Sequence, residues 1–326
     1  MTRALQLAAS VRTSTSPNPW VGCVLVTADG AIAGEGATAP PGGQHAEASA
    51  LRAAGARARG ATAYVTLEPC AHQGRTPPCA DALVAAGVDR VVIGVLDPDA
   101  RVAGRGIARL ERAGVEVVVG TLATEAEELL APYLVHRRSG RPFVVLKLAS
   151  TLDGRLAAPD GTSRWITGPK ARDDVQRLRA ESDAVLVGAG TVRVDDPRLT
   201  LRLPGEATRQ PLRVVLGRAP ADAALRPGLE LSGDIRSVLD ELGRRGVLQL
   251  LVEGGAHVAH ELHRLDLVDR YVFYLAPAML GGDDGLPVFA GSGAATMAEA
   301  WRGRLVSVDR LGNDVKVVVA PLRAGA

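Results

Sequence analysis

The 326-residue sequence has no long hydrophobic run, few cysteines and little net charge. No apolar stretch approaches the roughly 20 residues that a membrane-spanning helix requires. The apolar patch near the start of the chain is too short for a secretory signal, so we expect a cytoplasmic protein that does not engage a membrane. The net charge of +2, with basic and acidic residues interspersed, provides no basic stripe for a phosphate backbone. Nucleic acid is therefore a poor candidate partner.

The three cysteines are Cys23, Cys70 and Cys79, and they cannot all pair with one another. Cys23 lies in WVGCVLV, a run typical of a buried strand, where a thiol acts as a small hydrophobic group. Cys70 and Cys79 each follow a proline within EPCAHQGRTPPC, residues 68–79. These two cysteines are the pair that needs a chemical explanation.

Length and composition favour two folded domains, because 326 residues with 47% hydrophobic side chains can bury more than one core. In the first half, short Val/Ile runs alternate with Ala/Leu-rich stretches that end at glycine, which predicts a sheet with helices on its faces. Residues 121–142 indicate a helix with a basic end, followed by Gly140 and Pro142. We therefore predict domains at 1–140 and 141–326.

The second half begins with the predicted strand PFVVLKLAST and continues with further Val/Leu-rich strands. Helices are predicted at about 169–180, 234–245 and 255–265. The last strands lack helices long enough to separate them. This order predicts a parallel core with antiparallel strands added at its end, which is a mixed sheet.

His45 and Glu47 lie in GGQHAEAS, where a predicted helix opens. Residues two apart in a regular helix point in different directions, so these two can share a site only in the first turn. Cys79 opens PPCADAL, which resembles another helix start, and the partial positive charge of a helix N-terminus favours a metal-binding thiolate. One imidazole and two thiolates match a catalytic zinc with an open fourth position. His72 is a weaker candidate for a fourth ligand, since it lies between the cysteines.

Glu47 is suited to proton transfer beside such a metal. Zinc lowers the pKa of a bound water from near 16 to about 7, and a carboxylate that is not a ligand can move its proton to a leaving amine. This order of residues matches the zinc deaminases, but eight residues between the cysteines argue against their nucleic-acid editing members. Two alternatives remain open: a nucleobase deaminase acting on nucleic acid with an accessory domain, and a non-enzymatic structural zinc protein.

The motifs resemble, in order, those of the bifunctional riboflavin-biosynthesis deaminase/reductase family. The segments that carry this resemblance are TSPNPWVGCVLV, HAEASALRAAG, EPCAHQGRTPPCADAL, RPFVVLKLASTLDGRLA, DAVLVGAGTVRVDDPRLTLR and LVEGG. The resemblance covers nearly the whole chain. It implies the α/β fold class, with an N-terminal cytidine-deaminase-like α/β/α domain and a C-terminal dihydrofolate-reductase-like α/β domain with a mixed sheet.

The resemblance also implies two reactions on a small phosphoribosylaminopyrimidine. The first is zinc-dependent hydrolytic deamination of 2,5-diamino-6-(5-phosphoribosylamino)pyrimidin-4(3H)-one. The second is reduction of the ribosyl side chain by NADPH, which gives 5-amino-6-(5-phosphoribitylamino)uracil. The loop AHQGRTPP between the two cysteines could line the pocket of the phosphorylated pyrimidine. The resemblance further implies a homo-oligomer formed through the reductase domain.

The site residues follow from matching motifs. In the deaminase domain the resemblance implies zinc bound by His45, Cys70 and Cys79, proton transfer by Glu47 and a pyrimidine contact from Asn18. In the reductase domain it implies catalytic roles for Lys147 and Asp195. It assigns NADPH contacts to Ala149, Trp165, Thr167, Thr191, Asp195 and Gly255, and substrate contacts to Ser163, Arg179, Leu199, Arg202 and Glu253.

Some of these reductase assignments also have a physical reason. Lys147 lies inside a predicted strand, where a charge needs a partner or a ligand, and we expect it to bind the sugar end of the substrate. The glycines after LQLLVE, which include Gly255, allow a helix N-terminus to approach a phosphate. The two arginines of the set are suited to gripping a phosphate.

The sequence departs from the usual family pattern at several positions. Ala71 replaces an asparagine, Asp99 and Ala100 stand in DPDA where DPNP is usual, Thr151 replaces a serine, and Gly217 begins a segment that is often Asp-Ser. None of these residues is a predicted metal ligand. The departures therefore bear on fine substrate and cofactor contacts rather than on the metal.

Overall fold

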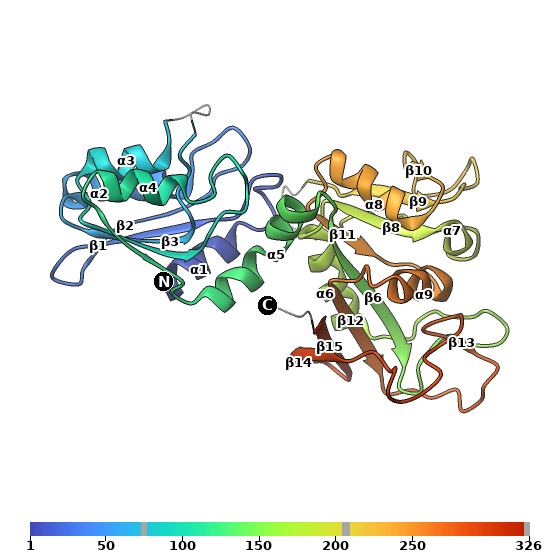
Figure 1. Ribbon diagram of the computed structural model, residues 1–326. Helices are drawn as coiled ribbons and strands as arrows, with labels where there is room; N and C mark the ends of the chain where they lie inside the picture. Colours follow the sequence, from blue (N-terminus) through green and yellow to red (C-terminus); the bar gives the residue numbers. More distant parts are fainter. Residues whose placement is uncertain (73–76, 204–208, 323–326) are drawn as a thin grey trace. The chain divides into compact units, whose positions relative to one another are not determined.

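The computed structural model describes residues 1–72, 77–203 and 209–322 (Figure 1). The chain divides into two compact units, Met1–Gly140 and Arg141–Ala326. The division falls directly after helix α5 (Ala123–Ser139), whose C-cap Gly140 has a φ of 76°. Glycine is common at such a helix end because this left-handed conformation strains residues with a Cβ. No helix in the described part of the chain is long and apolar enough to span a bilayer.

The first unit is built on a five-stranded sheet with the order β2-β1-β3-β4-β5. Its strands are β1 (Gly22–Val26), β2 (Ile32–Ala37), β3 (Thr62–Leu67), β4 (Arg90–Val95) and β5 (Glu116–Val119). Strand β1 is antiparallel to both of its neighbours, whereas β3, β4 and β5 run parallel. The parallel half matters most for the site, since the carboxyl ends of parallel strands lie at one edge.

Helices cover both faces of this sheet. In Figure 1, helices α2 (Ala46–Ala54), α3 (Cys79–Ala86) and α4 (Arg105–Arg112) lie together on one face, and α1 (Thr2–Ser10) and α5 lie on the other. This arrangement confirms the predicted α/β/α order. Helix α2 packs very close to the sheet, because a Cβ at Gly36 would lie 2.2 Å from the carbonyl oxygen of Ala46. The glycine therefore brings the start of α2 onto β2.

The second unit contains an eight-stranded sheet with the order β10-β9-β8-β11-β6-β12-β15-β14. Its strands are β6 (Phe143–Thr151), β8 (Ala184–Gly188), β9 (Leu212–Leu216), β10 (Leu229–Leu231), β11 (Gln249–Val252), β12 (Arg270–Ala276), β14 (Gly303–Leu311) and β15 (Asp314–Pro321). The pairs from β10 to β12 are parallel, and β15 and β14 are added antiparallel. The predicted mixed sheet is confirmed.

The helices of the second unit are α6 (Pro169–Ala180), α7 (Ala189–Asp195), α8 (Ile235–Arg244) and α9 (Ala256–Arg264), and a small ribbon pairs β7 (Arg155–Ala157) with β13 (Leu286–Pro287). Three of these helices agree with the predicted ranges to within one residue. Helix α8 shows why: its buried residues Ile235, Val238, Leu239 and Leu242 have helical spacing. Asp234 accepts a hydrogen bond from the backbone N–H of Ser237 and caps the helix.

Helices α1 and α7 are not predicted by the sequence patterns. Helix α7 has the sequence AGTVRVD, in which glycine and β-branched residues disfavour a helix. Helix α1 buries only two alanines, Ala4 and Ala8, so its apolar face gives a weak signal. Tertiary packing outweighs local preference in α7.

Candidate functional site

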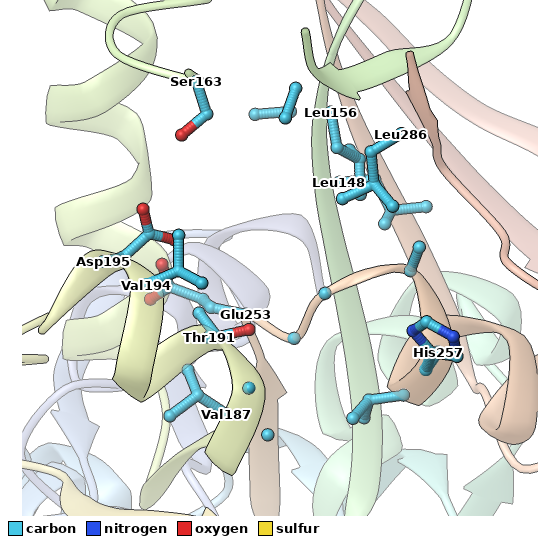
Figure 2. A pocket seen from close by; sticks show the side chains of 18 of the residues that line it. Leu148, Leu156, Ser163, Val187, Thr191, Val194, Asp195, Glu253, His257 and Leu286 are labelled. Atoms are coloured by element: carbon cyan, nitrogen blue, oxygen red, sulfur yellow. The ribbon is translucent and has the colours of Figure 1, made fainter. Parts of the chain in front are cut away.

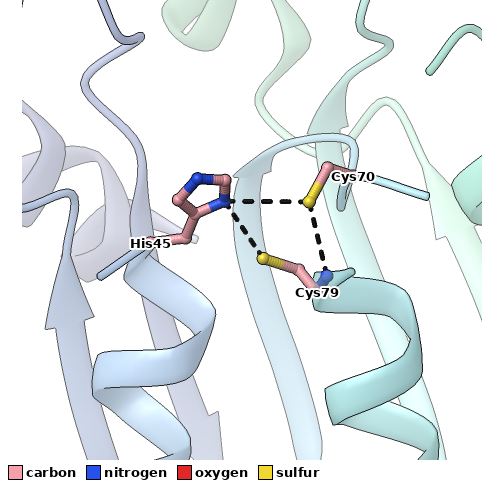
Figure 3. A group of neighbouring side chains, drawn as sticks. All are labelled: His45, Cys70 and Cys79. Carbon is pink, nitrogen blue, oxygen red and sulfur yellow. Dashed lines mark hydrogen bonds between the residues drawn. The ribbon is translucent and has the colours of Figure 1, made fainter. Parts of the chain in front are cut away.

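Three predicted zinc ligands meet at one end of the first unit (Figure 3). His45 is the N-cap residue of α2, Cys70 follows strand β3, and Cys79 is the first residue of α3. The Nδ1 atom of His45 lies 3.7 Å from Sγ of Cys70 and 3.3 Å from Sγ of Cys79. Two helix starts and one strand end therefore place three metal-binding atoms within 4.8 Å of one another.

This geometry fits zinc. A tetrahedral zinc with bonds of about 2.3 Å to sulfur and about 2.0 Å to nitrogen holds the nitrogen and sulfur roughly 3.6 Å apart. The two nitrogen–sulfur distances of 3.7 and 3.3 Å lie on either side of that value. His72 and Glu47 do not belong to the metal-binding group found among the described residues. Three protein ligands leave one position for a reactant.

The start of helix α3 stabilises one of the two sulfurs directly. The backbone N–H of Cys79 donates a hydrogen bond to Sγ of Cys70 at 3.3 Å. The pKa of Cys70 is lowered to about 4, chiefly by the neighbouring thiol of Cys79, then by His45 and by this backbone N–H. The contact between the two cysteine side chains, together with burial, raises the pKa of the Cys79 thiol. The backbone N–H at the start of helix α3 thus contributes to the stability of the Cys70 thiolate.

Glu47 lies in the first turn of α2 and is only 4% exposed. Burial and the nearby Cys70 raise the pKa of its carboxyl to about 7. A group that titrates near neutral pH can both accept and return a proton. Glu47 is therefore placed beside the predicted metal and has the chemistry of a general acid and base.

A cavity of about 150 Å³ lies beside the metal cluster. The predicted pyrimidine contact Asn18 lines it together with His45, Glu47, Cys70 and His72. The predicted pocket loop AHQGRTPP lies partly outside the described residues, since 73–76 are not among them. The described part of the chain thus brings every predicted deaminase residue to one cavity wall or to the metal cluster.

The cavity wall also includes residues that the motifs do not predict, among them Glu68, Asp97, Asp99, Tyr133 and Arg137. Asp97 follows the parallel strand β4, so its place at the carboxyl edge of the sheet was a usable signal. The Tyr133 hydroxyl on α5 donates to both carboxylate oxygens of Asp97, at 3.2 and 3.1 Å. Nothing local in the α5 sequence indicates this contact.

Some of the departures from the family pattern have local explanations. The carboxylate of Asp99 pairs with Arg101 at 2.7 Å, which balances its negative charge at the cavity wall. Thr151 donates to Asp153 and accepts from the backbone N–H of Arg155, as a hydroxyl at a turn can. Gly217 has a φ of 101°, a conformation that favours glycine. Nothing in the structure explains Ala71 or Ala100.

A larger cavity of about 720 Å³ lies in the second unit (Figure 2). It is formed by the ends of strands β6, β8 and β11 and by the starts of helices α7 and α9. Nine predicted residues line it: Lys147, Ala149, Ser163, Arg179, Thr191, Asp195, Leu199, Glu253 and Gly255. Residues far apart in the sequence therefore line one cavity.

Three predicted residues are not among those that line this cavity. Trp165 is 71% exposed, and the guanidinium of Arg172 lies 4.6 Å from its ring centre. The Thr167 carbonyl accepts a hydrogen bond from Arg172 at 2.7 Å. Arg202 is exposed, and its backbone N–H donates to Gln176. The structure does not bring these three side chains to the cavity.

The two glycines at the start of α9 allow close packing against neighbouring side chains. Gly255 is its N-cap, and a Cβ at Gly254 would lie 2.9 Å from Cβ of Val258. A Cβ at Gly255 would lie 3.2 Å from Oγ1 of Thr191. Free backbone N–H groups and the helix dipole favour an anion here. The cavity volume and this helix start fit a dinucleotide with its phosphates at α9.

Charged side chains on the cavity wall form a compact network. Arg179 donates two hydrogen bonds to Glu253, at 2.6 and 3.0 Å, and a third to the Thr200 carbonyl. Burial opposes the charge of Glu253, but Arg179 and Lys147 outweigh it and hold its pKa below the usual value. Burial lowers the pKa of Lys147, whereas Glu253 favours its charged form. Arg179 is thus committed to Glu253, which limits its capacity to grip a phosphate.

Comparison with known proteins covers almost the whole chain. Residues 142–317 match the RibD C-terminal domain, and residues 1–95 match the cytidine and deoxycytidylate deaminase zinc-binding region. The riboflavin biosynthesis protein RibD of Escherichia coli (strain K12) is 42% identical over 357 residues, with 97% of this chain and 96% of that protein covered. RibD of Mycobacterium tuberculosis (strain CDC 1551 / Oshkosh) is also 42% identical, with 96% and 94% covered.

Solved structures show the same relationship. Acinetobacter baumannii RibD, form 1, matches with a TM-score of 0.92 and 39% identity, covering 99% of this chain and 98% of the other. A diaminohydroxyphosphoribosylaminopyrimidine deaminase/5-amino-6-(5-phosphoribosylamino)uracil reductase from Thermotoga maritima matches with a TM-score of 0.87 and 37% identity, covering 98% and 97%. The similarity thus includes both units.

Proposed function

Because the chain belongs to the RibD family and is a bifunctional deaminase and reductase of riboflavin biosynthesis, we propose that each of its two units carries one activity. Residues 1–140 form the zinc-dependent deaminase domain, and residues 141–326 form the NADPH-dependent reductase domain. The Thermotoga maritima relative is named for a diaminohydroxyphosphoribosylaminopyrimidine and for 5-amino-6-(5-phosphoribosylamino)uracil. We assign the corresponding two substrates to the two domains of this chain.

In the deaminase domain, His45, Cys70 and Cys79 hold the zinc, and Glu47 moves the proton. The observation that carries this assignment is the His-Cys-Cys cluster with a buried carboxylate beside it that is not a ligand. A zinc ion held by these residues would lower the pKa of a bound water to about 7, so that hydroxide would be available to attack the pyrimidine carbon at neutral pH. Glu47 accepts a proton from this water and delivers it to the exocyclic amine, whose bond to the ring breaks as ammonia leaves. Asn18 orients the ring.

In the reductase domain, the start of α9 binds the phosphates of NADPH, whose nicotinamide supplies a hydride. Lys147 and Asp195 face the same cavity and hold the sugar end of the substrate at the reacting carbon. Glu253 is fixed by Arg179, so its carboxylate is a rigid acceptor for a sugar hydroxyl. A cavity of about 720 Å³ is of the size that binds small molecules.

The variant Glu47→Gln tests the separation of the two activities. We expect ammonia release to fall by about 100- to 10,000-fold, because the general acid and base is lost. Zinc content and NADPH oxidation on the deaminated pyrimidine phosphate should remain unchanged. Glu127→Gln, which alters an exposed carboxylate of the same unit, is the matched control. Loss of reduction in the Glu47 variant would contradict two independent sites.

We also propose a homo-oligomer formed through strand β14 of the reductase domain. Strand β14 is at the edge of its sheet, and Leu305 and Val308 are 59% and 57% exposed on it. Antiparallel pairing with the β14 of a second copy can place Leu305 opposite Val308 and Arg304 opposite Asp309, which matches apolar with apolar and opposite charges. An exposed apolar edge strand favours such pairing.

Sedimentation of Leu305→Lys tests this interface. We expect the variant to sediment as a smaller species than the wild type, because a charge enters the apolar part of the strand pair. Val119→Lys, on the exposed edge strand β5 of the other unit, should sediment as the wild type does. Equal sedimentation of Leu305→Lys and the wild type would reject β14 as the interface.

A further inference from the structure

Glu68 is a buried carboxylate that the proposed reactions do not use. It directly follows strand β3, is only 3% exposed and lines the deaminase cavity. A buried carboxylate is costly unless hydrogen bonds or charges compensate for lost water. Its two oxygens accept hydrogen bonds from the backbone N–H groups of Gly104 and Gly106, each at 3.1 Å. Glu68 thus joins the end of β3 to the start of helix α4.

The contact between these two segments is unusually close. A Cβ at Gly106 would lie 2.0 Å from the Pro69 carbonyl oxygen and 3.2 Å from Oε1 of Glu68. The backbone of Pro69 therefore lies directly against the first turn of α4. A carboxylate is favoured at this position, because the first N–H groups of a helix have no acceptor within the helix.

The next residue along the chain is the zinc ligand Cys70, which is held from a second direction by helix α3. Its sulfur accepts the N–H of Cys79 at 3.3 Å, and its carbonyl oxygen accepts the N–H of Ala80 at 3.2 Å. Asp81 of α3 forms an ion pair with Arg109 of α4, which links the two helices. Cys70 is thus fixed between two helix starts, and Glu68 is its connection to one of them.

We propose that Glu68 is a positioning residue for the metal-binding thiolate of Cys70. By holding the Glu68–Cys70 segment against α4, its carboxylate sets the position at which the Cys70 sulfur meets His45 and Cys79. The proposal rests on the zinc ligands assigned under the proposed function. Residues that orient metal ligands contribute measurably to metal binding, and their loss typically weakens it by about 10- to 100-fold.

Zinc competition with a colorimetric chelator on the full-length protein tests this role. Glu68→Gln has the same shape but presents an NH₂ group to one of two backbone donors, so the segment must move away from α4. We expect zinc affinity to fall by about 10- to 100-fold. Substitution with Co²⁺ should show weaker sulfur-to-cobalt charge-transfer absorption, because one thiolate is displaced. NADPH oxidation by the reductase domain should remain unchanged.

Thr66→Val is the matched control for a loss of stability. Thr66 lies on the same strand, is fully buried and accepts a hydrogen bond from the backbone N–H of Gly22 at 3.1 Å. Its replacement should lower the unfolding temperature of the deaminase unit without changing zinc affinity or the cobalt spectrum. If Glu68→Gln is not recovered as folded protein, Glu68→Asp is measured instead, since its shorter side chain cannot reach both amides.

Two results overturn the proposal, and they have different meanings. A folded Glu68 variant that behaves like Thr66→Val, with lower stability but wild-type zinc affinity, shows a purely structural role. If Cys70→Ser binds zinc as tightly as the wild type, Cys70 is not a ligand, and the proposed zinc site itself is wrong. Weaker zinc binding in the Glu68 variant, together with a changed cobalt spectrum, supports the positioning role.

Discussion

The deaminase and reductase sites differ in how the chain builds them. The metal cluster consists of three side chains, one histidine and two cysteines, that no other residue types readily replace. They lie at two helix starts and a strand end, beside a cavity of about 150 Å³. The reductase cavity is about 720 Å³, and its wall includes residues from Lys147 to Leu286, many of them apolar or contributing backbone. A site made of a few ligands is encoded by residue type and spacing. A broad cavity is encoded by the fold.

This difference predicts different responses to single substitutions. A metal site depends on each ligand, because three protein atoms share the ion and none is redundant. A broad cavity distributes binding over many contacts, each of which is worth a modest amount of free energy. Losses should therefore be severe at the metal and graded at the reductase cavity.

Removal of one metal ligand should have the largest effect. We expect Cys79→Ser to lose zinc. Ammonia release should then fall further than it does on loss of a general acid and base, which typically costs about 100- to 10,000-fold. NADPH oxidation on the deaminated substrate should be unaffected. Cys23→Ala is the control, since Cys23 is a fully buried thiol outside the metal cluster. Metal content and both activities are measured on the same preparations. A Cys79 variant that keeps its zinc would contradict the expectation that every metal ligand is essential.

Much of the fold and the family could be predicted from the sequence. The family, the fold class, the two activities and the zinc and NADPH requirements are confirmed. Apolar periodicity also gave helices α6, α8 and α9, because their buried faces repeat at helical spacing. Apolar periodicity does not predict helix α7, because Val192 is its only buried residue.

The wall of the deaminase cavity shows a second limit. Tyr133 contacts Asp97 across 36 residues of sequence, and Glu68 reaches Gly106 across 38. Such contacts depend on how α5 and α4 pack against the sheet, which residue spacing alone does not specify. By contrast, His45 and Glu47 are two residues apart at a helix start, where local geometry is predictable.

Replacing the cavity lysine should have an intermediate effect. Lys147→Met removes a half-buried charge near Glu253 while keeping an unbranched side chain that is one atom shorter. A hydrogen bond from a charged group contributes about 1.5–3 kcal/mol, so kcat/KM for the reduction should fall by about 10- to 100-fold. Ammonia release should not change. Lys170→Met, at an exposed position on α6, is the control. A Lys147 variant with wild-type reduction kinetics would remove the lysine from the site.

The smallest effect is expected at Trp165. The family resemblance assigns this residue an NADPH contact, whereas the structure places it outside the cavity wall, so its replacement tests which of the two predicts NADPH contacts correctly. Trp165 lies outside the cavity wall and is 71% exposed, so Trp165→Ala should change the KM for NADPH by less than about 3-fold. Thr191 lines the cavity beside Gly255, and Thr191→Val should raise this KM by about 3- to 10-fold through a lost hydrogen bond. The reverse order would mean that the segment around Trp165 moves onto the bound cofactor. The reductase site would then depend on a rearrangement, and the difference between the two sites would be greater than their resting geometry indicates.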